Sequence, residues 1–267
     1  MIQEYFGLTG EPFGKEILPE HLYLSLRFKE LLARLDYGVK KRYFCLVTGD
    51  IGTGKSTAIR ILAQNLDENK HKLLYLSDSN LKPRDFYREL LFQLGSNPGY
   101  LRIDAKRQFN QLILDYFEKR RITPIVVIDE AHLLSHQMLQ EIRFLTNFRM
   151  DSLSPMALIL VGQPELKGTL AMQIFQAIAQ RIQVRYHLGG LTLEETGAYV
   201  AHHLEVVKAR SQIFSTEAIK EIFAYSKGIP RLINNLCIQA MLDARIQDSH
   251  VVDREGVLRA IEDFRKF

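Results

Sequence analysis

Short apolar runs alternate with amphipathic segments along the first 188 residues. Five runs have the length of a strand, and they cover Tyr43–Val47, Leu73–Leu76, Ile125–Ile128, Ala157–Val161 and Ile182–Leu188. Between them, apolar residues recur with helical spacing, which predicts helices over residues 27–39, after residue 54, and over 85–94, 105–119 and 137–148. A run that is apolar throughout is typical of a strand buried on both faces. The alternation therefore predicts an α/β domain in which helices flank a five-stranded parallel sheet.

The pattern changes after Leu188, where two glycines are followed by helical periodicity alone. Helices are predicted over residues 193–208, 215–226, 230–247 and 253–264, and Thr192 and Ser215 stand where N-caps are expected. Residues 1–27 are rich in glycine, proline and aromatic residues and are interpreted as an ordered arm with little regular structure. We therefore expect two domains: residues 1–188, with the arm and the α/β domain, and residues 189–267, which are all helical.

Composition and charge narrow the class of protein. The chain has 267 residues, of which 46% are hydrophobic and 25% charged, as expected for a folded globular protein. Its net charge of +4 is concentrated in residues 1–188, which carry +5, and this excess permits a nucleic-acid partner. No apolar run is long enough to span a bilayer, and the N-terminus lacks the pattern of a signal peptide. Cys45 and Cys237 are predicted to be buried thiols, so we expect a cytoplasmic protein without membrane insertion.

A glycine-rich turn between the first strand and the next helix carries the clearest chemistry. It matches the phosphate-binding pattern G-x-x-x-x-G-K-[ST] in the strand–turn–helix context that the pattern needs. Glycines let successive N–H groups face a phosphate, and the helix N-terminus favours its negative charge. Lys55 would reach the β- and γ-phosphates, Ser56 would hold Mg²⁺, and Thr57 would contact the α-phosphate. The predicted ATP-binding residues are Gly49, Asp50, Ile51, Gly52, Thr53, Gly54, Lys55, Ser56 and Thr57.

Two adjacent acids follow the third strand. Asp129 is expected to complete the Mg²⁺ site, and Glu130 to orient and polarise a water for attack on the γ-phosphate. This pair predicts hydrolysis rather than phosphate transfer to another substrate. Asp129–His132 also spells a tetrad found in helicases with two motor cores, but the helical residues after Leu188 are too few for a second core. His132 and His136 are interpreted as surface histidines rather than a metal pair.

With these motifs, the chain resembles AAA+ ATPases, and in particular the ExeA/TnsC-like group of secretion ATPases and transposition helpers. Residues 5–8, 12–13 and 22–25 resemble the opening segment of that group. The resemblance implies an AAA+ core followed by a helical lid, and it makes Phe6 and Phe13 candidates for the adenine pocket. The alternative for both rings is packing of the arm onto the core.

The resemblance also assigns roles to residues outside the two motifs. Gln163, after the fourth strand, would sense the γ-phosphate; its alternative is a cap for the following helix. Arg231, with Pro230 before it, would report the γ-phosphate from the lid. Arg181, or else Arg185, would act on the nucleotide of a neighbouring subunit in a ring or filament, the alternative being a surface ion pair. Asn147 is a further polar candidate of the catalytic site.

The leading functional hypothesis is an ATPase, stimulated by duplex DNA, that assembles on the DNA and recruits or activates a transposase. This hypothesis is preferred over the secretion role because secretion members of the group continue into a membrane span, and no such span is predicted in this sequence. Contacts with the DNA backbone are expected from Lys82, Arg84, Arg102, Lys106, Arg107, Lys119, Arg120 and Arg121, each of which could equally lie on a solvated helix face. The alternatives are a cytoplasmic assembly ATPase of the general-secretion type and a slowly hydrolysing nucleotide switch.

Overall fold

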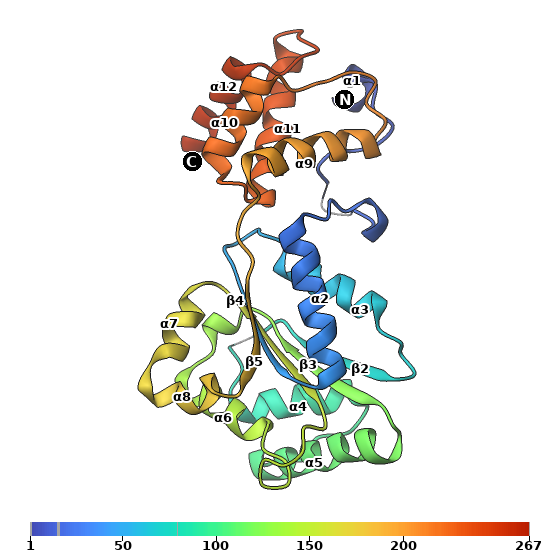
Figure 1. The fold of residues 1–267 in the computed structure, drawn as a ribbon, viewed down its shortest axis with the longest axis vertical. Helices are drawn as coiled ribbons and strands as arrows, with labels where there is room; N and C mark the ends of the chain where they lie inside the picture. The colour runs from blue at the N-terminus through green and yellow to red at the C-terminus, as the bar shows by residue number, and fades with distance from the viewer. Residues whose placement is uncertain (1, 15–16, 79, 267) are drawn as a thin grey trace. The chain divides into compact units, whose positions relative to one another are not determined.

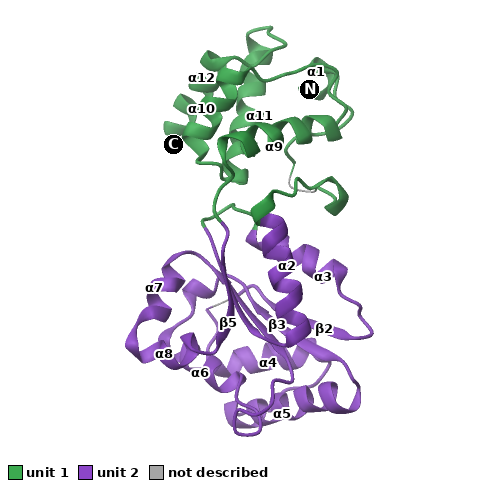
Figure 2. Ribbon diagram, viewed as in Figure 1, with its two compact units in different colours: residues 1–27, 50–54, 189–267 green, residues 28–49, 55–188 purple. Residues whose placement is uncertain are grey.

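The computed structural model describes residues 2–14, 17–78 and 80–266, and it divides the chain into two compact units (Figure 2). Residues 28–49 and 55–188 form one unit, which we call the α/β unit. Residues 1–27, 50–54 and 189–267 form the other, which we call the helical unit. The division after Leu188 falls where the sequence pattern changes, whereas the N-terminal arm groups with the helical unit and not with the α/β unit.

The α/β unit alternates strands and helices around one parallel sheet (Figure 1). In chain order its elements are α2 (Leu26–Lys41), β1 (Phe44–Thr48), α3 (Lys55–Asn65), β2 (His71–Leu76), α4 (Pro83–Gln93), α5 (Arg102–Leu114), the π-helical turn η2 (Asp115–Lys119), β3 (Thr123–Ile128), the 3-10 turn η3 (Ala131–Leu133), α6 (His136–Leu145), β4 (Ala157–Gly162), α7 (Glu165–Ala171), the 3-10 turn η4 (Gln173–Phe175), α8 (Gln176–Ala179) and β5 (Ile182–His187). The strand order is β2-β3-β4-β1-β5, and every neighbouring pair is parallel. The predicted fold class and all five strands are confirmed, while α8 was not anticipated.

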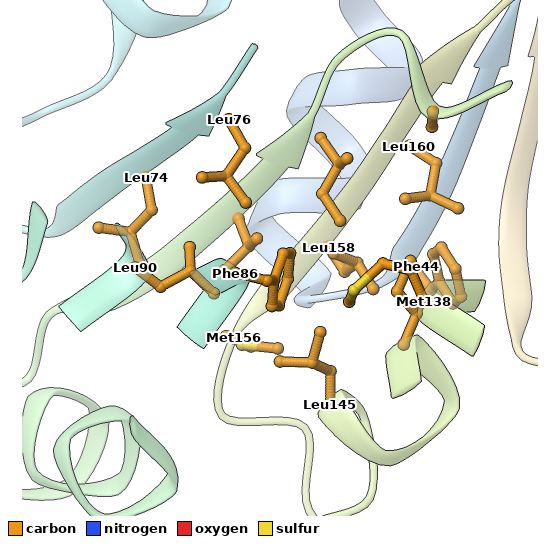
Figure 3. Close-up of a cluster of buried hydrophobic side chains, with 14 of the residues drawn as sticks. Phe44, Leu74, Leu76, Phe86, Leu90, Met138, Leu145, Met156, Leu158 and Leu160 are labelled. Atoms are coloured by element: carbon orange, nitrogen blue, oxygen red, sulfur yellow. The ribbon is translucent and has the colours of Figure 1, made fainter. Parts of the chain in front are cut away.

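Alternate residues of the strands pack on the two faces of the sheet, as the period of a strand requires. On one face, Phe44, Leu74, Leu76, Leu158 and Leu160 join a cluster with side chains of α4 and α6 (Figure 3). On the other face, α2 approaches β1 so closely that a Cβ at Gly38 would overlap the Cys45 sulfur. Burial raises the pKa of the Cys45 thiol to about 12, so this cysteine is an inert part of the core, as predicted.

The helical unit has a hydrophobic core of its own. It contains α1 (Ile2–Phe6), the 3-10 turn η1 (Pro19–His21), α9 (Leu193–Val206), α10 (Thr216–Ser226), α11 (Pro230–Ile246) and α12 (Arg254–Arg265). Thr192 and Ser215 cap α9 and α10 as predicted, and Thr192 forms a reciprocal capping box with Glu195. Phe6 and Phe13 are buried in this core, where the Phe13 ring stacks on His203 with 5.4 Å between centroids. Both rings thus pack the arm, but onto the helices of this unit and not onto the α/β core with which the arm was grouped.

Among the described residues, no helix is both long enough and apolar enough to cross a lipid bilayer.

Candidate active site

The phosphate-binding loop joins the end of β1 to the start of α3, as the motif predicts. Gly52 and Gly54 adopt φ angles of +86° and +104°, a region that residues with a Cβ rarely occupy. The Thr53 hydroxyl donates a 2.9 Å hydrogen bond to the Asp50 carbonyl, which closes the turn on itself. The two glycines therefore stand where the backbone needs them, at the entrance to the helix whose N-terminus would face a phosphate.

Lys55 is the first residue of α3, and its side chain is buried. Its ammonium group donates a 2.8 Å hydrogen bond to the carbonyl oxygen of Gly49, at the other end of the loop. This bond joins the first residue of α3 to the residue that follows β1. Binding a nucleotide would let the ammonium exchange this carbonyl for phosphate oxygens, a charge-assisted and stronger partner.

The loop and the acidic strand end meet at Ser56 and Asp129. The Ser56 hydroxyl donates a 2.8 Å hydrogen bond to Oδ2 of Asp129, and the Tyr75 hydroxyl donates a 2.7 Å bond to the same oxygen. Tyr75 lies on β2, the neighbour of β3, so its ring reaches the carboxyl end of the adjacent strand. Burial, followed by the hydrogen bond to Asp129, raises the pKa of Tyr75, so the hydroxyl stays protonated and donates a hydrogen bond to the carboxylate.

Glu130 follows Asp129 in a left-handed backbone conformation, with φ 49° and ψ 34°. Two hydrogen bonds hold this conformation: its N–H donates to Oδ1 of Asp129 at 2.8 Å, and its carbonyl accepts from the Leu133 N–H at 2.9 Å. A residue other than glycine in this region costs about 1 kcal/mol or more and is often found at functional sites. The Glu130 side chain itself is 46% exposed.

Gln163 and His132 meet beside Glu130. Gln163 follows β4, and its side-chain nitrogen lies 2.8 Å from Nε2 of His132. Nδ1 of the same ring lies 3.4 Å from Oε2 of Glu130. The interpretation of His132 as a surface histidine is wrong, because its side chain is only 12% exposed and packs between two polar residues of the site. His136, four residues further on, is exposed as expected.

The side chains fit Mg²⁺ with a nucleotide. Ser56 and Asp129 offer a hydroxyl and a carboxylate, which are the hard oxygen ligands that Mg²⁺ prefers, and they already lie within hydrogen-bonding distance. Among the described residues, no group of three or more His, Cys, Asp and Glu side chains could hold a metal without other ligands. Such a site suits an ion that takes its remaining ligands from phosphate and water, as Mg²⁺ does in phosphate-transfer enzymes.

The other predicted site residues lie in different places. Within the helical unit, the Arg231 N–H donates to the Gly52 carbonyl at 3.3 Å, so the start of α11 contacts residues 50–54. A Cβ at Gly52 would lie only 2.5 Å from the Cβ of Arg231.

Asn147 is exposed beyond the end of α6, in the segment that precedes β4. It is thus at the amino edge of the sheet, whereas Asp129 and Gln163 follow the carboxyl ends of their strands. The proposed catalytic role of Asn147 in its own subunit has no support in this geometry.

The two arginines proposed to act in a neighbouring subunit differ in their contacts. Arg181 donates to the Arg143 carbonyl, the Thr146 hydroxyl and the Asp151 carboxylate at 2.8 to 3.0 Å. Arg185 donates to the main-chain carbonyl of Ala179. To reach another subunit, Arg181 would have to give up its hydrogen bonds to three partners. Arg185 would have to give up fewer.

Several basic residues proposed to contact DNA form ion pairs within the α/β unit. Lys106 and Arg102 face the carboxylate of Glu141, and Lys119 and Arg120 face that of Asp115. Arg84 lies 3.6 Å from Asp85. In the part of the chain that the structure describes, no ion pair is found for Lys82, Arg107 and Arg121. Much of the basic charge of this unit is thus already neutralised by neighbouring acids.

Comparison with known proteins agrees with the geometry. Residues 39–170 match the model of the AAA domain family. The chain is 34% identical over 258 residues to general secretion pathway protein A of Aeromonas hydrophila, an alignment that covers 94% of this chain and 46% of that protein. The chain belongs to the AAA+ family. It resembles the secretion member of the group inferred from its motifs, and it spans about half the length of that relative.

Solved structures show the same AAA+ fold at low sequence identity. Cdc6p from Pyrobaculum aerophilum is 16% identical, with a TM-score of 0.70 over 94% of this chain and 70% of that one. A Drosophila ORC chain from a complex with DNA is 18% identical, with a TM-score of 0.67 over 97% of this chain and 65% of that one. The Thermotoga maritima RuvB branch-migration motor is 17% identical, with a TM-score of 0.58 over 91% of this chain and 72% of that one. At these identities the likeness concerns the fold.

The AAA+ motifs did not reveal Tyr75 and His132. Tyr75 occupies an ordinary position on a predicted strand, and only the pairing of β2 with β3 brings it to Asp129. For His132, the sequence did contain a signal. The residue lies three positions after Asp129, where a tight turn at the end of β3 brings the chain back toward the site.

Proposed function

We propose that this AAA+ chain binds ATP with Mg²⁺, hydrolyses it, and acts as an assembly ATPase of the general-secretion type. The observation that carries the proposal is the 2.8 Å contact of Ser56 with Asp129, which unites the two halves of the phosphate site. The name of the Aeromonas hydrophila relative favours the secretion role over the transposition role. A cytoplasmic location, as predicted from the sequence, is part of this proposal.

In the proposed reaction, each residue of the site has a distinct task. Lys55 and the N–H groups of the loop hold the phosphates, and Ser56 and Asp129 hold Mg²⁺, which neutralises charge on the phosphate oxygens. Glu130 orients a water and accepts its proton as the water oxygen bonds to the γ-phosphorus. The bond from that phosphorus to the bridging oxygen of ADP breaks, which gives ADP and phosphate. Gln163 would contact the γ-phosphate or the attacking water.

The test is ATP hydrolysis by the purified chain and by variants of the two motifs. Lys55→Ala should abolish ATP binding, whereas Glu130→Gln should bind ATP and lose about 100-fold or more in kcat, the usual worth of a positioned base. Glu68→Gln is the matched control, because Glu68 is an exposed carboxylate in the turn after α3. If the wild-type chain binds ATP without hydrolysing it, or Glu130→Gln retains its turnover, the proposed reaction is wrong.

A transposition helper that assembles on duplex DNA is the second candidate. The excess of five positive charges in residues 1–188 favours it, although the ion pairs of Lys106 and Arg120 reduce the exposed charge. The argument from a missing membrane segment carries no weight, because the chain spans 46% of its secretion relative. DNA binding through the backbone predicts turnover that rises with duplex DNA at low salt and loses this stimulation at moderate salt.

Lys82, Arg107 and Arg121 are the residues to change in that experiment, because no ion pair holds them among the described residues. Replacing all three with alanine should abolish DNA stimulation and leave basal hydrolysis unchanged. Wild-type turnover that is insensitive to DNA at every salt concentration would reject the DNA role and leave the secretion role. Very slow turnover that no polymer stimulates would favour a nucleotide switch.

Assembly into a ring or filament is proposed with either role, since an arginine from a neighbouring subunit would complete the site. Arg185→Ala and Arg181→Ala should both be tested, with ATP-dependent association measured beside turnover. A variant that assembles normally but does not hydrolyse ATP would identify the arginine that acts between subunits. A wild-type chain that hydrolyses ATP as a monomer would exclude this role for both residues.

A further inference from the structure

His132 lies between Glu130, the proposed base, and Gln163, which follows β4. Its ring lies between Glu130 and Gln163, with Nδ1 3.4 Å from Oε2 of the glutamate and Nε2 2.8 Å from the amide nitrogen of the glutamine. The proposed reaction uses the residues on either side of the ring and assigns it no task. A polar ring that is 12% exposed and has polar neighbours at both nitrogens must nevertheless adopt one orientation.

Two polar groups face Nδ1 of His132. In the neutral ring Nδ1 accepts a hydrogen bond from the main-chain N–H of Gln163 at 3.5 Å. Oε2 of Glu130 lies 3.4 Å from the same nitrogen and forms an ion pair with the ring when the ring is protonated. At the other end of the ring, the side-chain nitrogen of Gln163 lies 2.8 Å from Nε2. The ring therefore contacts Gln163 through both nitrogens and Glu130 through one, which links the positions of these two residues.

Glu130 needs such a partner because its own environment fixes only its backbone. Two main-chain contacts hold its left-handed conformation, but its side chain is 46% exposed and can adopt several rotamers. A general base must lie within hydrogen-bonding reach of the water that it deprotonates. The imidazole is a stiff group on the same turn that pairs with the carboxylate when the ring is protonated, so it restricts the carboxylate at small entropic cost.

Gly162 allows the turn to come close enough. A Cβ at this position would lie 3.1 Å from the main-chain nitrogen of His132 and 3.6 Å from that of Ala131. The end of β4 is therefore in direct contact with η3, and the contact sets the distance between the His132 ring and Gln163. The arrangement depends on a close approach of two backbones, which does not adjust as easily as a surface side chain.

We propose that His132 is a positioning residue, which fixes the Glu130 carboxylate for water activation and makes its position depend on that of Gln163. The inference rests on the proposed hydrolysis of ATP. Because Gln163 is expected to contact the γ-phosphate or the attacking water, His132 would transmit the state of the phosphate site to the base. His132 itself does not touch the reacting atoms.

Two conservative substitutions distinguish the contact at Nδ1 from the contact at Nε2. In His132→Asn the amide lies where Nδ1 was and can still donate to Glu130, whereas in His132→Gln the amide reaches toward Gln163 instead. We expect His132→Ala and His132→Gln to lower kcat about tenfold or more, with KM for ATP changed less than twofold. His132→Asn should retain kcat within about threefold of wild type, since it keeps the contact to the base. His136→Ala is the matched control and should hydrolyse ATP as wild type does.

A second measurement uses the Glu130→Gln background. There, His132→Ala should cause no further loss of the residual turnover, because the group that it positions has been removed. Thermal melting and ATP affinity, measured for every variant, show whether the fold is kept.

The results separate this inference from the proposed function. If the wild-type chain hydrolyses ATP and His132→Ala keeps its kcat within twofold, the inference is wrong and the proposed function stands. Equal losses in the Asn and Gln variants, or a raised KM in both, would assign a merely structural role to the ring and overturn the inference. A wild-type chain that binds ATP without hydrolysing it would overturn both.

Discussion

Substituting Gly162 with alanine tests whether the close approach of β4 to η3 sets the geometry of the site. The added methyl group would lie 3.0 Å from Cδ2 of Leu166, 3.1 Å from the His132 nitrogen and 3.6 Å from the Ala131 nitrogen. Ordinary contacts of a methyl group are near 3.5 to 4.0 Å, so the turn must move by a few tenths of an ångström. Overpacking of this kind costs about 1–3 kcal/mol, because a buried strand end and a tight turn have little freedom to relax.

The matched control is Gly168→Ala, in the middle of α7. Nothing lies within 4 Å of a Cβ built there, and alanine is favoured over glycine inside a helix by about 0.5–1 kcal/mol. The same chemical change should therefore lower the free energy of unfolding at residue 162 and raise it at residue 168. Urea unfolding measures both values, and ATP hydrolysis should fall several-fold in Gly162→Ala alone. Equal stability and equal turnover for the two variants would refute the contact as a determinant of the site.

Three further predictions concern Asp129, the capping of α9 and a buried histidine. Tyr75→Phe removes a hydroxyl donor to Asp129, so the Mg²⁺ concentration for half-maximal ATP hydrolysis should rise about tenfold; an unchanged Mg²⁺ requirement would contradict this. Thr192→Ala, which breaks the capping box, should lower the unfolding free energy by about 1 kcal/mol, while Thr169→Ala in α7 should have a smaller effect. Burial, followed by the charge of His202, lowers the pKa of His203 to about 4, against 6.5 for the free side chain. Its contribution to stability is complete above pH 6.5 and is lost as the pH falls toward 4, because the unfolded chain binds the proton first. Between pH 7.5 and 4.5 the wild type should therefore lose about 2.5 kcal/mol more than His203→Phe, and equal losses would show that His203 is not buried in its neutral form.

The strands and the phosphate motifs could be predicted because their signals are local in the sequence. A run such as Ile125–Ile128 is apolar because both faces of its strand are covered. The residue after this run therefore lies at the carboxyl end of the strand. Gly52 and Gly54 are glycines because their φ angles are positive, which the motif already encodes. Thr192 and Ser215 were recognised as caps because a capping residue acts on the N–H groups next to it in sequence.

The residues that were missed depend on neighbours far away in sequence. Tyr75 contacts Asp129 because β2 pairs with β3 in a register that places Tyr75 opposite Val127, and no periodicity in either strand contains that register. His132 is largely covered because a glycine 30 residues later lets β4 approach its turn. Such contacts are set by tertiary packing, so the sequence pattern alone favoured the commoner outcome, an exposed histidine.

Counting charges was weak evidence for a nucleic-acid partner, because tertiary packing also decides which basic residues form ion pairs within the fold. The surroundings of Glu141 show this. This buried carboxylate on α6 accepts a hydrogen bond from the Tyr87 hydroxyl and pairs with Lys106, with Arg102 3.6 Å away. Burial alone would raise the pKa of Glu141, but the hydrogen bonds from Lys106 and Tyr87 outweigh it, and the pKa lies below the ordinary value. Lys106 is therefore needed to keep a charged group inside the α/β unit, and its replacement would destabilise the packing of α5 on α6 whether or not DNA binds. A loss of DNA stimulation in Lys106→Ala would not identify a DNA contact, which is why Lys82, Arg107 and Arg121 are the residues that test it.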